Sequence, residues 1–369
     1  MPLPETPPPV PSQSGPGGRR LRLARLGRGL SQRQLAQSCG ISRQALAGVE
    51  SGAWSPSLGL ALRLARALGS TVDELFSVEP GPEELEVVAL ATGAFGDRAR
   101  ITRVFERWVA LPLKGEAAWS PGFLPANGSL GEAGRRAVLR GGAGGLVVAG
   151  CDPGLGLLAA STGPREGGWS VHWWPCGSRD ALRLLGEGLV HAAQIHYPAA
   201  ERPGAMPGRA RIGIGFARWR EGLLFRRPGP EPTSLAEAAR LGWRWINREP
   251  GAEARALLDR ELDRADLDGR ELPGYDSRAL SHFAVAAAVA SRSADVGLAA
   301  EPVALAFGLG FLPLSEEESV LVVEQSRLGT EEGQQLLRLL GRPALGRELG
   351  AVPGYDAGIC GEALPPGAG

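Results

Sequence analysis

The sequence predicts a small all-α domain followed by a larger α/β domain. Between residues 19 and 76, short amphipathic stretches are separated by glycine and serine, which is typical of a run of short helices. After residue 145, apolar strand-like stretches alternate with helical ones, which indicates an α/β fold with a mostly parallel sheet. Residues 19–76 hold nine arginines and three acidic residues, whereas the whole chain of 369 residues holds 40 charges of each sign. A basic module on a more acidic body is typical of a nucleic-acid-binding protein with a second function.

We expect four segments along the chain. Residues 1–18 contain seven prolines and no apolar periodicity, so they are expected to be a disordered tail. Residues 19–78 form the helical domain. Residues 79–143 open with a stretch rich in proline and glutamate and continue with short apolar stretches between glycines, which indicates a linker and a β-rich connecting segment. Residues 144–369 form the α/β domain.

Cysteine spacing and hydropathy exclude several classes of protein. The cysteines at positions 39, 151, 176 and 360 lack the spacing of zinc ligands, so we expect no metal site and no cofactor. The longest apolar run, residues 283–290, is far shorter than the roughly 20 residues needed to cross a bilayer. The N-terminal residues also lack the basic-then-apolar pattern of a secretion signal. We therefore expect a reduced, cytoplasmic protein without a membrane partner.

The sharpest signal is the stretch LSQRQLAQSCGISRQALAGVESG, which begins at Leu30. Ser31 and Gln34 have the spacing of a capping box, which marks the start of a helix. Gly40 is expected to end that helix, and Ser42 is expected to cap the next one. Two short helices joined by a glycine-centred turn form a helix-turn-helix.

Two further helices are expected to complete this domain. The stretch WSPSLGLALRLARALG predicts a third helix that starts at Pro56 and is capped at its C-terminus by Gly69. Thr71 and Glu74 have the spacing of another capping box and predict a fourth helix.

The spacing of these motifs resembles that of the phage-repressor (Cro/C1, or XRE) helix-turn-helix family over residues 19–76. The resemblance implies that the second helix of the pair lies in the DNA major groove while the start of the first contacts phosphate. By position, Gln32 would contact phosphate. Ser42, Arg43 and Gln44 would read base edges, because arginine suits guanine and glutamine suits adenine. Gly48 departs from the family, which often has a longer side chain there, so attraction between arginine and phosphate would supply much of the affinity.

In the α/β domain, predicted helices follow directly after strand ends that contain glycine. This happens at residues 150–152 (GCD), 177–179 (GSR) and 247–251 (NREPG). Open α/β sheets bind ligands at the carboxyl ends of their strands. The unpaired N–H groups at a helix start also favour an anion. We therefore expect these three turns to converge on one ligand site.

A second resemblance is carried, in order, by GCDPGLGLLA, CGSRDALRLLGEGLVHAAQIH, FARWREGLLFR, WRWINREPGAEARALLDREL and PGYDSRALSHFAVAAAVASRSADVGLA. Together, at about residues 144–363, they resemble a cytoplasmic periplasmic-binding-protein-like domain that is related to molybdate-binding proteins. The resemblance implies a type II fold of two α/β lobes, joined by crossing strands, that close on a small molecule such as an oxyanion. It implies these candidate ligand-binding residues: Cys151, Asp152, Ser178, Arg179, Asn247, Arg248, Glu253, Arg255 and Tyr275.

The third of these turns departs from the family it resembles. The family reads N-R-x-x-G-S-G-T-R, and residues 247–255 here read NREPGAEAR. Ala252 and Ala254 replace two hydroxyl donors, and Glu253 replaces a glycine. Two interpretations stay open: Glu253 only stabilises the helix dipole, by about 0.3–1 kcal/mol, or the site has changed its ligand or is filled by Glu253 itself. We expect molybdate and tungstate to bind weakly or not at all.

Other candidate residues have structural interpretations. His191 and His196 lie five residues apart in a stretch predicted to be helical, so they do not share a face and a structural role is expected rather than a metal pair. Trp173 and Trp174 are expected in the core, and Asp295 in a turn or hinge. No Cys–His–Asp arrangement is visible in the sequence, so no catalytic residue is predicted.

These observations together predict a ligand-responsive transcription regulator that is not an enzyme. The N-terminal domain would bind a double-stranded DNA operator as a homodimer, and the C-terminal domain would bind a small molecule. The alternative is an enzyme or accessory protein of molybdenum-cofactor-related metabolism that carries a DNA-binding domain. A third possibility is a constitutive DNA-binding protein whose α/β domain is only a scaffold.

Overall fold

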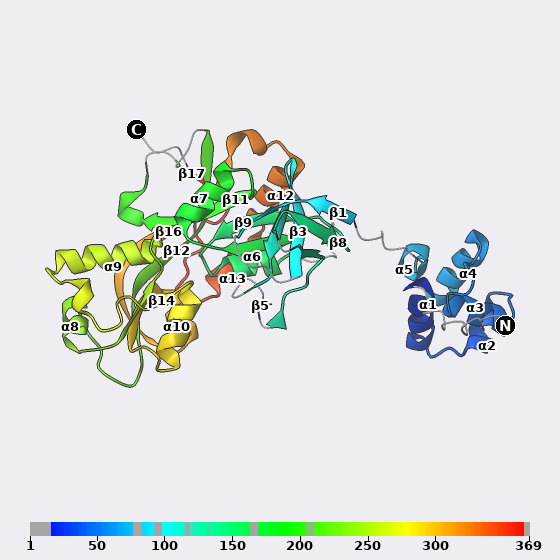
Figure 1. Ribbon diagram of the computed structural model, residues 1–369, viewed down its shortest axis with the longest axis horizontal. Coiled ribbons are helices and arrows are strands. Elements are labelled where there is room, and N and C mark those ends of the chain that lie inside the picture. Colours follow the sequence, from blue (N-terminus) through cyan, green and yellow to red (C-terminus); the bar gives the residue numbers. More distant parts are fainter. Residues whose placement is uncertain are drawn as a thin grey trace, which may run out of the picture. The chain divides into compact units, whose positions relative to one another are not determined.

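The computed structural model describes residues 16–76, 83–91, 98–114, 119–120, 122–131, 133–162, 169–203, 206 and 210–364. Most of the predicted tail (1–15) and the start of the predicted linker (77–82) lie outside these ranges. The chain forms two compact units, which we call unit 1 (Met1–Gly81) and unit 2 (Pro82–Gly369) (Figure 1).

Unit 1 is built from helices around one small core. The helices are α1 (Pro16–Gly27), α2 (Gln32–Ser38), α3 (Arg43–Glu50), α4 (Leu58–Leu68) and α5 (Val72–Phe76). Leu21, Leu35, Leu46 and Leu64 are fully buried in this core. The apolar face of each helix therefore packs within unit 1 itself.

The predicted capping boxes of unit 1 are confirmed. The Ser31 hydroxyl accepts the Gln34 backbone N–H at 3.2 Å, and the Gln34 side-chain oxygen accepts the Ser31 N–H at 2.8 Å. Thr71 and Glu74 make the same reciprocal pair at 3.1 and 2.9 Å. The Ser42 hydroxyl caps α3 by accepting an N–H at 3.0 Å. These local signals therefore fix the helix starts.

The third helix differs slightly from the prediction at its start. It begins at Leu58 rather than at Pro56, because the Ser57 hydroxyl supplies the cap by accepting the Leu60 N–H at 3.4 Å. It ends as predicted at Gly69, which has a left-handed φ of +55° that glycine adopts without strain.

Unit 2 begins with a small sheet, which agrees with the β-rich prediction for this stretch. Its order is β1-β8-β7-β3-β4-β2, and its described pairs are antiparallel except β2 with β4. The strands are β1 (Glu83–Glu86), β2 (Val88–Ala89), β3 (Arg98–Val104), β4 (Arg107–Pro112), β7 (Gly128–Leu130) and β8 (Arg136–Leu139); β5 (Trp119–Ser120) and β6 (Gly122–Phe123) form a separate hairpin.

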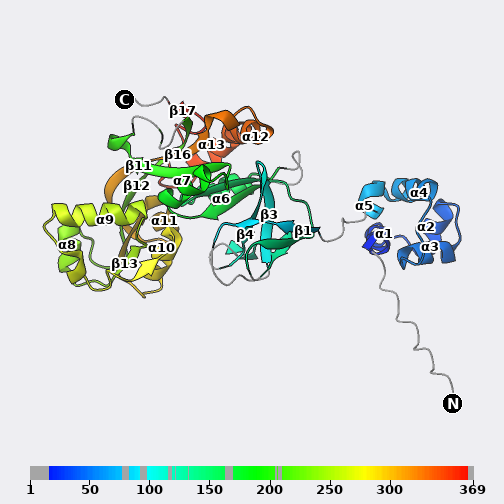
Figure 2. The ribbon, with the colours of Figure 1, turned by 45° about the horizontal axis from the view of Figure 1, so that its top comes forward.

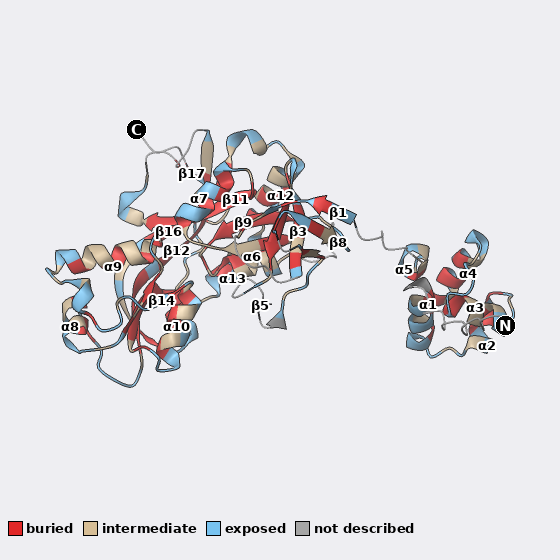
Figure 3. Ribbon diagram, in the orientation of Figure 1, coloured by how far each residue is buried: buried red, intermediate tan, exposed pale blue. Residues whose placement is uncertain are grey.

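The rest of unit 2 is organised around a nine-stranded sheet. Its order is β10-β9-β11-β16-β12-β15-β13-β14, and β17 also pairs with β12. The strands are β9 (Leu146–Gly150), β10 (Val171–Pro175), β11 (Ala192–Pro198), β12 (Arg211–Phe225), β13 (Trp245–Arg248), β14 (Arg278–Ala279), β15 (Val296–Ala300), β16 (Gly310–Glu324) and β17 (Ala363–Leu364). Figure 3 shows these strands largely buried and the outer helix faces exposed.

The helices divide this sheet into two lobes (Figures 1 and 2). Lobe A contains β9, β10 and β11 with α6 (Leu155–Ala160), α7 (Ser178–Gly186), α12 (Glu331–Leu340) and α13 (Pro343–Gly350). Lobe B contains β13, β14 and β15 with α8 (Leu235–Arg240), α9 (Glu253–Arg264), α10 (His282–Ala290) and α11 (Glu301–Ala306). The predicted two-lobed α/β fold is confirmed.

Two long strands connect the lobes. Both β12 and β16 have 15 residues. On β12, Trp219 packs in the core of lobe A and Leu223 in that of lobe B; on β16, Val320 packs in lobe A and Leu312 in lobe B. Because these strands run antiparallel to each other and to β11 and β15, the centre of the sheet is antiparallel. The mostly parallel sheet of the prediction is therefore found only on either side of this centre.

The helix predicted after the second glycine turn is shorter than expected. The stretch that ends in HAAQ was predicted to be helical, but α7 ends at Gly186 and β11 begins at Ala192. The helix is followed by its C-cap Glu187 and then by Gly188, which has a left-handed φ of +68°. His191 and His196 therefore do not lie on a helix, and His196 belongs to a strand.

Among the described residues, none of the helices combines the length and apolar character needed to cross a membrane.

Candidate functional site

The predicted DNA-reading residues lie at the start of α3. Arg43 and Gln44 are exposed, and neither side chain has a hydrogen-bond partner within the described part of unit 1. The Ser42 hydroxyl, by contrast, is used to cap the helix. A β-carbon at Gly48 would lie 3.0 Å from the ring of Trp54, so the aromatic ring covers the position where a longer reading side chain was expected.

Gln32 is held by an internal contact. Its side-chain amide donates to a carboxylate oxygen of Glu50 at 2.9 Å. Glu50 is buried and also accepts two hydrogen bonds from Arg25, at 2.6 and 3.0 Å. The contact with Glu50 fixes the rotamer of the Gln32 side chain. A contact between Gln32 and a DNA phosphate stays a prediction.

The three glycine turns of unit 2 are brought together in part. A β-carbon at Gly177 would lie 3.6 Å from the carbonyl oxygen of Gly251 and 3.8 Å from the α-carbon of Ala252. The turn after β10 in lobe A therefore touches the turn before α9 in lobe B. The Ser178 hydroxyl is buried there without a hydrogen-bond partner among the described residues, while Arg179 is exposed.

Asp152 is occupied by structural contacts. Its carboxylate accepts hydrogen bonds from the Tyr355 hydroxyl at 2.5 Å, the Ser319 hydroxyl at 2.5 Å and the Trp219 indole at 3.2 Å. It also accepts the Gly154 N–H at 2.8 Å. Asp152 is fully buried and ties the turn after β9 to the crossing strands, and a ligand contact by Asp152 stays a prediction.

Asn247 and Arg248 are almost fully buried at the end of β13. The Asn247 side chain accepts the Arg248 backbone N–H at 2.9 Å. The Arg248 guanidinium donates to both oxygens of Glu249, at 2.9 and 3.0 Å, and to the carbonyl oxygen of Leu280 at 3.3 Å. Its charge is therefore already paired.

Arg255 on α9 and Tyr275 in the turn before β14 form a separate group. The guanidinium carbon of Arg255 lies 4.1 Å from the centre of the Tyr275 ring, and both side chains bond the Asp259 carboxylate. Glu253 is half-buried, and no hydrogen bond or ion pair joins it to another described residue. The negative charge of Glu253 repels that of Glu221 at the lobe junction and so contributes to raising the pKa of Glu221.

The other residues considered from the sequence have clear positions. Nδ1 of His191 accepts the Val147 N–H at 2.9 Å, which confirms a structural role. Trp173 and Trp174 are half-buried and pack against the two cores of lobe A. Asp295 pairs with two arginines at a strand start.

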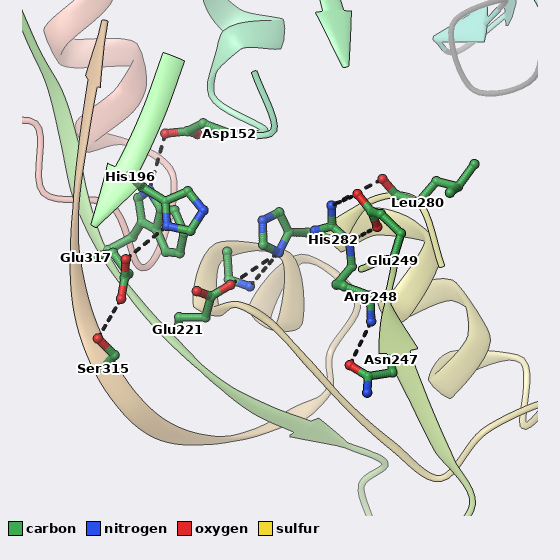
Figure 4. A network of polar contacts seen from close by, with 12 residues as sticks. Asp152, His196, Glu221, Asn247, Arg248, Glu249, Leu280, His282, Ser315 and Glu317 are labelled. Carbon is green, nitrogen blue, oxygen red and sulfur yellow. Dashed lines mark hydrogen bonds and ion pairs between the residues drawn. The ribbon is translucent and has the colours of Figure 1, made fainter. Parts of the chain in front are cut away.

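The strongest concentration of buried polar groups lies where the two lobes meet on the crossing strands (Figure 4). We call it the interlobe cluster, and its members are Cys151, His196, Glu221, Arg248, His282 and Glu317. Cys151 and His196 come from lobe A, His282 and Arg248 from lobe B, and the two glutamates from β12 and β16.

Each histidine of the cluster has a glutamate at its Nδ1 atom. Nδ1 of His196 lies 2.9 Å from a carboxylate oxygen of Glu317, and both side chains are about 98–99% buried. Nδ1 of His282 lies 3.8 Å from Glu221, with both side chains 1% exposed, and it accepts the Ala300 N–H at 3.2 Å. Nε2 of His282 and both Glu221 oxygens are buried without a hydrogen-bond partner among the described residues.

Local backbone geometry places Glu221 inside the cluster. The pairing of β12 with β16 shifts register between Glu221 and Gly222. A β-carbon at Gly222 would lie 2.1 Å from the Leu312 carbonyl oxygen, so only glycine fits. The irregularity lies at the point where β12 passes from one lobe to the other, and its acidic residue is therefore enclosed between them.

The charges of the cluster are strongly perturbed. Burial raises the pKa of Glu221 to about 7 although His196 favours its charged form. Burial also opposes protonation of His196, but the Cys151 sulfur and the Glu317 carboxylate outweigh it, so the pKa of His196 lies well above its ordinary value. Burial and nearby positive charge hold the pKa of His282 well below its ordinary value. Strongly shifted groups at one place mark a candidate functional site.

Three residues of this cluster escaped the sequence analysis. His282, Glu221 and Glu317 were not among the candidates, and His196 was given only a structural role. The available signal was weak: each glutamate interrupts or borders an apolar strand stretch, and His282 starts an apolar helix. The structure also places Cys151 close to His196, whose Nδ1 atom bonds Glu317, an arrangement that the sequence did not reveal.

Comparison with known proteins identifies both parts of the chain. Residues 21–75 match the helix-turn-helix family, and residues 159–341 match a PBP superfamily domain. An HTH-type transcriptional regulator of Methanothermobacter thermautotrophicus is 44% identical over 52 residues, which are 14% of this chain and 75% of that protein. The protein YvgK of Bacillus subtilis is 30% identical over 180 residues, which are 47% of this chain and 56% of YvgK.

Among solved structures, a phosphate-bound putative phosphate ABC transporter substrate-binding protein of Clostridium perfringens aligns with a TM-score of 0.43 and 11% identity, over 56% of this chain and 96% of that one. The chain spans 56% of the length of YvgK, the curated relative described above. It belongs to the XRE-type helix-turn-helix transcriptional regulators, and it carries a PBP superfamily domain in unit 2.

Proposed function

We propose that the protein is a transcription regulator whose binding to an operator responds to a ligand held between the lobes of unit 2. The observation that supports this most is the interlobe cluster, where both Glu221 oxygens and His282 Nε2 are buried without a hydrogen-bond partner in the described part of the chain. Unpaired buried groups are rare because each costs free energy, so they favour a site that a ligand completes.

The DNA-binding half of the proposal rests on α3. Arg43 and Gln44 are exposed at its start, the part of a recognition helix that meets base edges. A homodimer would place two such helices in successive major grooves, and the protein would work in the cytoplasm, where its operator lies. Gln32 and the surrounding arginines would position the helix on phosphates.

A gel-shift titration at fixed salt tests this half. Arg43→Ala should weaken binding to the operator by roughly 1–3 kcal/mol, the value of a good bidentate base contact. Arg66→Ala is the matched control, because it removes the same charge from the exposed face of α4 in the same unit. Equal losses for the two variants would mean that Arg43 contributes only charge and that α3 does not read bases.

The ligand half requires a difference in affinity between two states. A ligand that bound open and closed lobes equally would shift nothing. Thermal melting of the full-length protein, combined with operator titration in the presence of each candidate compound, tests it. Stabilisation with altered operator affinity supports a sensor, and stabilisation without altered affinity contradicts regulation by that ligand.

A second candidate is a thiol-dependent enzyme. Cys151, His196 and Glu317 lie in the order of a nucleophile, a base and an orienting carboxylate. The burial of His196, Glu221, His282 and Glu317 favours the sensor, since a base and carboxylates enclosed between the lobes are poorly placed to act on an incoming substrate. Turnover of a ligand that is abolished by Cys151→Ser would favour the enzyme.

A further inference from the structure

Uncommon metal-ligating side chains converge in the interlobe cluster. The chain has only four histidines and four cysteines. Two of the histidines, His196 and His282, and the cysteine Cys151 place one ligand atom each within 4.8 Å of one another. They come from three separate segments, so sequence proximity does not explain the grouping. One ion could contact all three after a small closure, because Zn–N bonds are about 2.0 Å long and Zn–S bonds about 2.3 Å.

The two imidazoles direct their free nitrogens toward each other. Nδ1 of His196 bonds Glu317, which leaves Nε2 on the side of His282 (Figure 4). Nε2 of His282 is buried and has no hydrogen-bond partner in the described structure. Because buried nitrogen atoms are almost always satisfied, this unpaired atom beside a second imidazole and a thiol points to a bound ion.

The glutamates supply the support that metal-bound histidines usually have. Such histidines donate the other ring N–H to a carboxylate. Glu317 is already 2.9 Å from His196 Nδ1. Glu221 lies 3.8 Å from His282 Nδ1, which accepts the Ala300 N–H. With a small movement of the ring, a protonated Nδ1 could donate to Glu221 instead.

Charge and ligand type favour a transition-metal cation. Neither Glu221 oxygen has a hydrogen-bond partner among the residues that the structure describes, and the Arg248 guanidinium is already bonded to Glu249. A divalent cation would offset the remaining buried carboxylates. One sulfur and two imidazole nitrogens select a borderline-soft ion such as Zn²⁺ over Mg²⁺ or Ca²⁺, which prefer oxygen ligands.

We infer that Cys151, His196 and His282 bind one divalent transition-metal ion of the Zn²⁺ class, with Glu317 and Glu221 as positioning residues. The inference rests on the proposed function in one respect: since Cys151 belongs to lobe A and His282 to lobe B, the ion would be the ligand that holds the lobes together. Binding releases the thiol proton of Cys151 and any proton on Nε2 of His196 to solvent.

Cobalt titration of the full-length protein tests the site. The protein is reduced, stripped of metal and titrated with Co²⁺, whose thiolate charge-transfer absorption reports a cysteine ligand. We expect saturation at one Co²⁺ per chain and displacement by Zn²⁺. Cys151→Ser should abolish the charge-transfer band, whereas Cys176→Ser, the matched control after the adjacent strand β10, should leave it unchanged. A band that persists in Cys151→Ser would overturn the assignment.

Further variants distinguish the loss of a metal ligand from misfolding. His282→Asn should lower Co²⁺ affinity by at least about 100-fold, and Glu317→Gln by about 10–100-fold, as expected for a ligand and for a residue behind it. Circular dichroism of each metal-free variant must match that of the parent. A correctly folded parent that gives no charge-transfer band with excess Co²⁺ would also contradict the site.

Operator binding separates the two proposals. If Zn²⁺ binds at the cluster but leaves operator affinity unchanged, the metal site stands and regulation by the ion is wrong. If no metal binds but another small molecule alters operator affinity, the regulatory function stands and the metal site is wrong.

Discussion

Buried carboxylates have different surroundings in the two units. In unit 1, Glu50 accepts two hydrogen bonds from Arg25 and one from Gln32, so every part of its charge is matched. In unit 2, neither oxygen of Glu221 has a hydrogen-bond partner among the described residues, and its ion-pair contact with His282 is 3.8 Å long. The first arrangement is what a structural residue needs, because a buried charge without a partner is costly. The second is expected only where something else completes the site.

The Arg25–Glu50 pair gives a prediction for unit 1. Glu50→Gln leaves the Arg25 guanidinium buried without its counter-charge, which should destabilise unit 1 by about 3–5 kcal/mol. Hydrogen exchange of the α1–α4 amides in the full-length protein measures the loss. Glu187→Gln, which breaks an exposed pair with Arg183 on α7, should change the protection of α7 by no more than about 1 kcal/mol. Unchanged protection of α1 in Glu50→Gln would contradict a structural role for the pair.

Glu253 gives a second prediction at this scale. Its negative charge acts at the lobe junction, where it contributes to raising the pKa of Glu221. A dianion held near Glu253 would meet a repulsion on the order of 2 kcal/mol per charge at about 8 Å and an effective dielectric of 20. Calorimetric titration with molybdate should therefore show little or no binding to the parent and measurable binding to Glu253→Gly. Asp263→Asn, on the exposed side of α9, is the control. Tight binding of molybdate by the parent would show that Glu253 points away from the site.

Returning serine and threonine to positions 252 and 254, where the family has them, would not restore both hydroxyl groups to the site. Ala254 packs in the hydrophobic core of lobe B, so a threonine there would crowd the core and would not present its hydroxyl to a ligand. Of the two replaced hydroxyl residues, Ala252 alone lies at the turn that touches Gly177.

Element by element, the sequence predicted what depends on near neighbours. The caps at Ser31, Ser42 and Thr71 were foreseen because each involves residues three positions apart. The extent of α7 was not foreseen, because LVHAAQ fits both a helix and a strand until its pairing with β16 is known. Only the family resemblance implied that β12 and β16 pass from one lobe to the other. No local sequence pattern predicts the pairing partners of a strand of 15 residues.

The start of α9 allows a test of cap energetics. Ala252 has the backbone conformation of an N-cap, with φ of −76° and ψ of 139°, but no side-chain hydrogen bond. Ala252→Ser should supply a hydroxyl to the first turn and stabilise unit 2 by about 0.5–2 kcal/mol. Ala265→Ser at the other end of the same helix is the control and should have little effect. Thermal melting that is unchanged or lower in Ala252→Ser would mean that the buried position cannot accommodate the added oxygen.

At the scale of the whole molecule, the candidate site depends on long-range topology. Cys151, Glu221 and His282 become neighbours only because β12 and β16 pass through both lobes. The sequence could place Cys151 at a strand end, but it contained no information on which residues of the other lobe would face it. The ligand candidates that it gave were instead those of the turns, and several of these, such as Asp152 and Tyr275, are occupied by structural contacts.

The division into two units predicts a division of function. Unit 1 has a core of its own, and residues 19–76 hold nine arginines against three acidic residues. A fragment ending near residue 78 should therefore fold and keep weak DNA binding that falls steeply with salt, because charge supplies most of its affinity. A fragment beginning at Glu83 should fold, keep the one-equivalent Co²⁺ titration of the full chain, and bind no DNA. Gel shifts at several salt concentrations measure the first expectation, and circular dichroism with cobalt absorption measures the second. Equal DNA affinity for the two fragments would contradict this division, whereas loss of cobalt binding in a folded Glu83 fragment would show that the site needs residues outside unit 2.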